Sequence, residues 1–210
     1  NPIGIENILS RVTGTNLSEI DGLLGVDGAA NLFLLNPNGI TFGPNAELDI
    51  RGSFTVSTAD TYQFEGAAAP VNIQGTEFLT MSVPLGVQRG MQPQGDVMNE
   101  GDLAVDAGQS LTLFGDTVLS SGSLAVPAGR VEVLGNRVGV IDQALIDVSG
   151  DVGGGTVLVG GDYQGQGNVP NAERIYVGSD VVINADSLTA GDGGQVVVWA
   201  NGDTRFFGDI

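Results

Sequence analysis

The spacing of short apolar pairs in the second half of the chain constrains its fold more than any other feature. Leu103/Val105, Leu111/Leu113 and Val118 are followed in the same order by Leu124/Val126, Val131/Val133 and Val138/Val140. Each pair thus recurs after about 20 residues. This period is typical of a solenoid in which every coil contributes one short strand to each of three parallel sheets. The two members of a pair lie two positions apart, so both face the core.

Glycine-containing segments separate these pairs and supply the corners of the predicted coils. They lie at residues 106–108, 114–116, 120–122, 127–129 and 134–136, and the whole chain contains 34 glycines. Gly, Asn and Asp accept the backbone conformations of sharp corners, which β-branched residues do not. The sequence therefore predicts an all-β, single-stranded parallel β-helix with three sheets.

The repeat continues less regularly on both sides of this region. Leu145 follows Leu124 at nearly the same interval, so the two residues are expected to be aligned in successive coils. Val157 follows Val131 at a longer interval. Residues 150–155 are therefore interpreted as a lengthened corner, and residues 160–174 as a loop that leaves the solenoid. Further strands are expected at 5–12, 32–35, 40–42, 48–50, 54–56, 175–177, 181–183 and 196–199. The segment 196–199 is continuously apolar, which predicts a strand buried on both faces.

Three missing residue types exclude several kinds of active site. The chain has no histidine, cysteine or lysine, and its basic residues are seven arginines against 25 acidic residues, for a net charge of -18. A catalytic triad, a cysteine nucleophile, a zinc site built on imidazole or thiolate and a Walker-type phosphate loop are therefore excluded. The negative charge opposes binding to nucleic acid. No enzymatic activity, metal or cofactor is predicted.

Five motifs near the start of the chain have a familiar order and spacing. They are residues 7–14 (NILSRVTG), 20–23 (IDGL), 30–40 (ANLFLLNPNGI), 42–46 (FGPNA) and 52–54 (GSF). Together they resemble the haemagglutination-activity, or two-partner secretion, domain of filamentous-haemagglutinin-like proteins. The likeness is dense over residues 3–64, whereas the later coils resemble the downstream repeats of that family in style only.

This resemblance implies a fold, a partner and a location. Proteins of this family are right-handed parallel β-helices that a barrel transporter with periplasmic POTRA domains exports across the outer membrane of Gram-negative-type cells. Many of them then act as adhesins, so the chain is expected to be secreted or to lie at the cell surface. We expect a two-partner-secretion-like domain over residues 1–100, N-terminally incomplete, followed by a continuous β-helical extension over 101–210.

The resemblance also singles out candidate residues for structure or transporter recognition. They are Asn7, Arg11, Thr13, Gly14, Asn31, Asn36, Pro37, Asn38 and Gly39. Pro37 restricts φ at a turn, Asn38 and Gly39 suit a left-handed corner, and asparagine side chains can bond successive coils. A tight corner with a short asparagine ladder and direct contact with a transporter are two compatible interpretations.

Other candidates have simpler structural explanations. Asp147, Asp151, Asp180, Asp186 and Asp192, with Arg174 nearby, are read as solvated corner residues, with Ca²⁺ binding or polysaccharide cleavage as alternatives. The glycine runs at 153–155 and 191–194 are read as corners. Tyr163, in a segment rich in Gln and Gly, is a candidate glycan contact, although an ordinary loop also explains it. Trp199, Phe206 and Phe207 are read as core or inter-coil stacking residues.

Three functional hypotheses follow from these observations. The first is a module for export and surface adhesion with about seven to nine coils, given about 20 residues per coil. The second is a subunit of an extracellular filament, because the unpaired strand edges at the two ends of a β-helix allow self-association. The third is a polysaccharide-binding lectin or enzyme.

Overall fold

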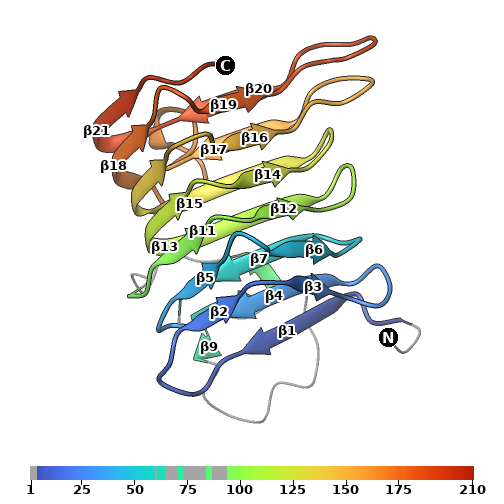
Figure 1. Cartoon of the computed structure of the whole chain (residues 1–210), viewed down its shortest axis with the longest axis vertical. Coiled ribbons are helices and arrows are strands. Elements are labelled where there is room, and N and C mark those ends of the chain that lie inside the picture. Colours follow the sequence, from blue (N-terminus) through green and yellow to red (C-terminus); the bar gives the residue numbers. More distant parts are fainter. Residues whose placement is uncertain (1–3, 60, 65–70, 73–83, 87–93) are drawn as a thin grey trace.

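The computed structural model describes residues 4–59, 61–64, 71–72, 84–86 and 94–210. Within these residues almost every element is a short β-strand, and the coils stack along one axis with the two termini at opposite ends (Figure 1). Each strand of a coil pairs in parallel with a strand of the next coil. The predicted parallel β-helix is therefore confirmed.

Three faces enclose the core. Face 1 contains β1 (Asn7–Arg11), β4 (Asn31–Leu35), β7 (Phe54–Ser57), the first halves of β13 (Ser110–Ser120) and β15 (Arg130–Val140), β17 (Thr156–Val159) and β20 (Gln195–Val198). Face 2 contains β2 (Ser18–Ile20), β5 (Ile40–Phe42), β11 (Val97–Asn99), the second halves of β13 and β15, β18 (Ala172–Val177) and β21 (Ala200–Phe206). Face 3 contains β3 (Leu23–Gly25), β6 (Glu47–Asp49), β12 (Asp102–Ala104), β14 (Ser123–Ala125), β16 (Leu145–Asp147) and β19 (Val182–Asn184). Because β13 and β15 bend round a corner, faces 1 and 2 form one 12-stranded sheet, and face 3 is a separate six-stranded sheet.

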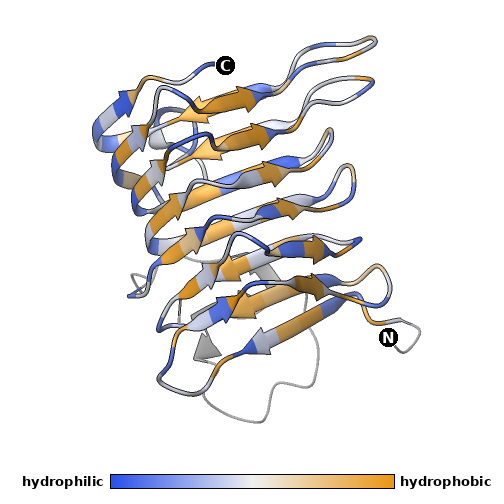
Figure 2. Ribbon diagram, viewed as in Figure 1, coloured by the Kyte–Doolittle hydropathy of each residue, from blue (hydrophilic) through white to orange (hydrophobic). Residues whose placement is uncertain are grey.

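Apolar side chains form columns inside the three faces. On face 1 the column contains Leu32, Phe54, Leu111, Val131, Val157 and Val196. On face 3 it contains Leu24, Leu48, Leu103, Leu124, Ile146 and Ile183. Each fully buried Val, Leu or Phe contributes about 1.5–3 kcal/mol relative to exposure, so the columns supply the main drive for stacking. Figure 2 shows that apolar residues are concentrated on the strands, where hydrophilic residues alternate with them, and that the connecting loops are of mixed character.

The pairing confirms the register that the apolar spacing predicted between residues 103 and 140. Leu103 pairs with Leu124, Leu111 with Val131 and Val118 with Val138. Val157 also lies over Val131 as expected, after the lengthened corner.

One detail of the predicted register and one detail of the predicted burial differ from the structure. Leu124 pairs with Ile146, and Leu145 pairs with Ser123, because the corner after β15 is two residues longer than the corner after β13. Ile146 therefore faces the core, whereas Leu145 points outward. The strand β20 is buried only in part: the outward Val197 is buried, whereas Val196 and Val198, which pack against the core, are partly exposed because β17 is the only strand that pairs with β20 among the described residues.

Backbones approach closely at the corner between faces 3 and 1. A Cβ atom on Gly155 would overlap the carbonyl oxygen of Gly129, and one on Gly194 would overlap the carbonyl oxygen of Gly155. The two glycine runs thus lie in stacked corners, and Gly154 N donates to Asp192 O at 3.1 Å. At these positions a side chain is excluded by the coil below.

Two excursions leave the solenoid at the corner between faces 1 and 2. The first contains β8 (Thr61–Phe64), β9 (Val71–Asn72) and β10 (Pro84–Gly86), which form an antiparallel sheet. The second spans residues 161–171 and contains the 3₁₀-helix η1 (Tyr163–Gly165). It is shorter than the predicted loop, since β18 begins at Ala172.

The bases of the two excursions share a second apolar cluster outside the main core. Ala59, Phe114 and Leu134 are buried there, and Val169 of the second excursion packs against them. Satellite clusters of this kind are common under long loops. The outward side chains of β13 and β15 at this corner are thus covered.

Candidate functional site

The first four motifs that carry the family resemblance lie in the first two coils and are joined by side-chain hydrogen bonds. Asn31 Nδ2 donates to Asn7 Oδ1 at 2.9 Å, Asn38 Nδ2 donates to Gly14 O at 2.9 Å, and Asn45 Nδ2 donates to Asp21 Oδ2 at 3.1 Å. Each bond spans 24 residues, and one lies at each corner of the coil. We call these three pairs the corner stitches.

Asn36 forms the buried centre of the site. Its side chain is fully buried, and its Nδ2 donates to Asn16 O at 3.0 Å and to Ser18 Oγ at 2.9 Å. Its Oδ1 accepts from Asn38 N and Asn38 Nδ2, both at 3.0 Å. One amide therefore holds the turn that contains it and also joins that turn to the preceding coil.

The turn at residues 36–39 is enclosed on both sides along the coil axis. Gly39 N donates to Asn36 O at 3.1 Å, and Ser18 N of the first coil donates to Gly39 O at 3.0 Å. On the other side Gly95 packs so closely that a Cβ there would meet Pro37 O at 2.7 Å. Gly39 has φ +122°, whereas Asn38 does not have a positive φ, so the left-handed conformation predicted for both residues occurs at Gly39 alone.

Burial divides the predicted motif residues into two groups. Asn36 and Gly39 are buried, and Asn7, Arg11, Asn31 and Pro37 are half-buried. Thr13, Gly14 and Asn38 are exposed and lie together at the corner between faces 1 and 2, where the Asn38 amide meets Gly14. We call these three residues the exposed corner. They are the most solvent-exposed residues of the motif.

Asp21 is a site residue that was not among the predicted candidates. Its carboxylate accepts from Asn45 N at 2.8 Å and from Asn45 Nδ2, and these two bonds lower the pKa of Asp21 below its ordinary value. Asn16 and Ser18 were missed as well. The signal that could have found Asp21 is the constant offset that relates Asn7 to Asn31 and Asp21 to Asn45.

This pKa shift gives a pH-dependent prediction. A carboxylate whose pKa is lowered on folding stabilises the fold above its unfolded pKa, near 3.8, and loses that effect as the pH falls through the folded value. The substitution Asp21→Ala should therefore lower the urea midpoint at pH 6, and the difference from the wild type should shrink below pH 3.8. Urea unfolding of both proteins across this range measures it. A difference that stays constant with pH would contradict the assignment.

The remaining candidates do not form a reactive site among the described residues. Asp151, Asp180, Asp186 and Asp192 are exposed, Asp147 accepts from Ser149 N, and no group of three or more metal-ligating side chains converges in the described part of the chain. Tyr163 is 62% exposed on η1, which leaves its role in glycan contact a prediction. No helix within the described ranges is long and apolar enough to cross a membrane.

The predicted stacking residues near the end of the chain occupy three different environments. Phe206 packs against the core, and Phe207 contacts Tyr176 of the preceding coil. Trp199 is half-buried beside the second excursion, where its Nε1 and Asn171 Oδ1 are buried without a hydrogen-bond partner in the described residues.

Comparison with known proteins identifies the family. The family model for the TPS secretion domain matches residues 1–198. A solved structure similar to this chain is the HMW1 secretion domain from Haemophilus influenzae, with 16% sequence identity, coverage of 99% of this chain and 87% of that chain, and a TM-score of 0.36. No curated protein sequence gives a significant match. The chain belongs to the TPS secretion domain family, and it is therefore a module of a protein that a partner outer-membrane transporter exports from a Gram-negative-type cell by two-partner secretion.

Proposed function

We propose that the exposed corner of the first two coils is the surface by which the POTRA domains of the transporter recognise this exoprotein. The observation that carries the proposal is the division of one motif into buried and exposed residues. Asn36 and Gly39 maintain the turn from inside, whereas the Asn38 side chain projects at the surface beside Thr13 and Gly14. Asn38 Oδ1 accepts no hydrogen bond from the described residues, so it is available to a partner donor.

The corner stitches support this proposal by making the surface rigid. Their bonds join the two coils at every corner, and Asn36 adds two further bonds between them. A preorganised surface binds more tightly because less conformational freedom is lost on association. The same stitches hold the first coils in register while later coils stack on them.

After export, the exoprotein acts in this proposal as a surface adhesin without catalysis. Stacking of successive coils buries the apolar columns, and this burial favours folding outside the cell, where no ATP is available. The folded rod presents three long faces to its surroundings (Figure 1).

The substitution Asn38→Ala tests transporter recognition. We expect the affinity for the purified POTRA domains of the partner transporter to fall about tenfold or more. Loss of the hydrogen bonds that the Asn38 amide makes to the partner should reduce the binding free energy by about 1.4 kcal/mol or more. Export into the medium should fall in parallel. Asn136→Ala is the matched control, since Asn136 is also exposed at the corner between faces 1 and 2, but near the middle of the rod. Normal binding and export of the Asn38→Ala protein would refute the proposal.

A further inference from the structure

The outward residues of the last coils on face 2 form a regular surface. Parallel pairing aligns Arg137 with Arg174 and Asp203, and Gly139 with Tyr176 and Arg205, while Ile141, Gly178 and Phe207 follow the ends of the three strands. Val138, Val140, Ile175 and Val177 between them point into the core. Neighbouring positions lie about 4.8 Å apart between coils and about 6.6 Å apart along a strand. We call these nine outward residues the face 2 grid.

Two aromatic rings are exposed in this grid. Tyr176 is 46% exposed and Phe207 is 59% exposed, and their ring centroids lie 5.8 Å apart at an interplanar angle of 53°. Gly139 lies below Tyr176, and Gly178 directly follows the strand that carries Tyr176, so neither position carries a side chain that covers the ring. Leu119, one coil further down, lies against the Gly139 position, where a Cβ would be 2.7 Å from Leu119 Cδ1.

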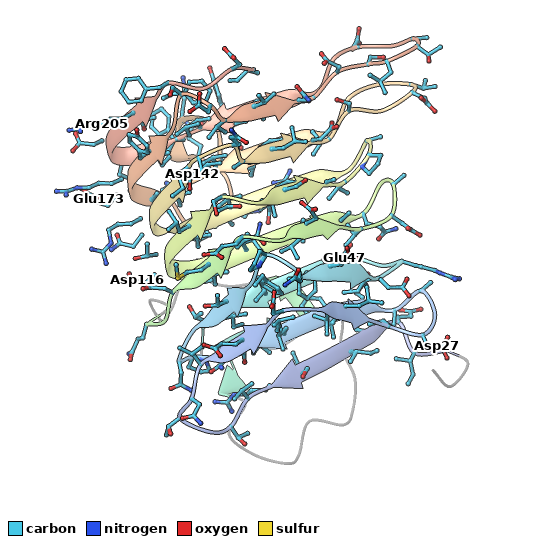
Figure 3. All side chains as sticks on the ribbon, in the orientation of Figure 1. Asp27, Glu47, Asp116, Asp142, Glu173 and Arg205 are labelled. Atoms are coloured by element: carbon cyan, nitrogen blue, oxygen red, sulfur yellow. The ribbon has the colours of Figure 1, made fainter. Side chains whose placement is uncertain are left out.

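The grid also concentrates positive charge in an acidic protein. It contains three of the seven arginines and one acidic residue, Asp203, whereas the whole chain has a net charge of -18. Arg137 forms an ion pair with Asp116 at 3.2 Å. Arg174 and Arg205 are exposed and have no ion-pair partner among the described residues. Figure 3 shows the Arg205 side chain directed away from the body of the rod.

We propose that the face 2 grid binds an acidic polysaccharide. The exposed rings offer apolar faces on which pyranose rings stack, and the two unpaired guanidinium groups bind the carboxylates of uronic acid units. Charge complementarity selects this ligand, because unpaired arginines flank the rings while most other surface charges of the chain are negative. Gly139 and Gly178 carry no side chains, so they do not obstruct an extended chain that lies across successive coils.

This binding surface is separate from the exposed corner that we propose for transporter recognition. The exposed corner lies in the first two coils, and the grid lies in the last three coils of face 2. Binding is measured on the purified, folded chain and needs no export, so failure of one proposal leaves the other intact.

The test is calorimetric titration of the full chain with polygalacturonate oligomers in buffer containing EDTA. We expect saturable binding that weakens with added salt, and no binding of the fully methyl-esterified oligomers. The double variant Arg174→Gln/Arg205→Gln should lose affinity at least about tenfold, and Tyr176→Ser should lose it about fivefold or more. Arg51→Gln, which removes an exposed arginine at a distant corner, should bind like the wild type.

Three results would overturn the proposal. They are equal binding by the double variant and the wild type, equal binding of acidic and esterified oligomers, and dimerisation of the chain through Tyr176 and Phe207 without polysaccharide binding. Sedimentation velocity of the wild type and of Phe207→Ser separates the last result from the first two. Urea midpoints within experimental error of the wild type confirm that each variant is folded.

Discussion

Replacement of Leu111 by alanine should lower the free energy of unfolding by about 3–5 kcal/mol, because it removes a fully buried side chain and leaves a cavity. Leu111 is 0% exposed and lies between Phe54 and Val131 in the apolar column of face 1. Interiors are close-packed, so the neighbours can fill only part of the space. Denaturant unfolding of the purified chain measures the loss.

Leu119→Ala is the matched control for this cavity. Leu119 lies on the same strand, β13, but points outward on face 2 and is half-buried. Its truncation should cost about 1 kcal/mol or less, in the range of surface substitutions. If both variants are destabilised equally, the assignment of the inner and outer sides of the strand is wrong. If burial of new coils drives translocation, Leu111→Ala should also slow secretion more than Leu119→Ala does.

Replacement of Asn36 by alanine should destabilise the fold by about 2–4 kcal/mol, since it removes a buried amide and leaves several partly buried polar groups without partners. Asn16 O and Ser18 Oγ lose their donor, and Asn38 N loses its acceptor. Alanine is also smaller than the fully buried amide that it replaces. The urea midpoint measures the overall effect, and amide exchange at Asn38 should become faster.

Asn38→Ala separates stability from recognition. Asn38 is exposed, and its amide makes one bond to Gly14 O and one to Asn36 Oδ1. Its removal should therefore cost about 1 kcal/mol or less. A large loss of stability in Asn38→Ala, or a negligible loss in Asn36→Ala, would contradict the division of the motif into a buried centre and an exposed corner.

Much of the fold could be predicted because the coils between residues 103 and 140 have nearly constant length. Equivalent apolar positions between Leu103 and Val140 can be aligned along the chain, since successive coils there pair at almost the same offset. The first coils were harder, because β2 and β3 are short strands with few buried apolar residues and their coils are longer. The motif residues were recognised there, Asn7 and Gly14 among them, but the first-coil partners Asn16, Ser18 and Asp21 were not.

Local sequence determined two properties of this protein by itself: the alternation of inward and outward residues, and the positions of the corners. These depend only on neighbouring residues, through strand geometry and through the side chains that a tight turn accepts. Which residues meet between coils depends on the length of every intervening corner and excursion. Thus the longer corner after β15 places Ile146 over Leu124, and the excursion at 161–171 must be traversed before Tyr176 lies over Gly139. Only the tertiary structure decided the corner stitches, the buried bonds of Asn36 and the face 2 grid, because register between coils is set by the accumulated path of the chain.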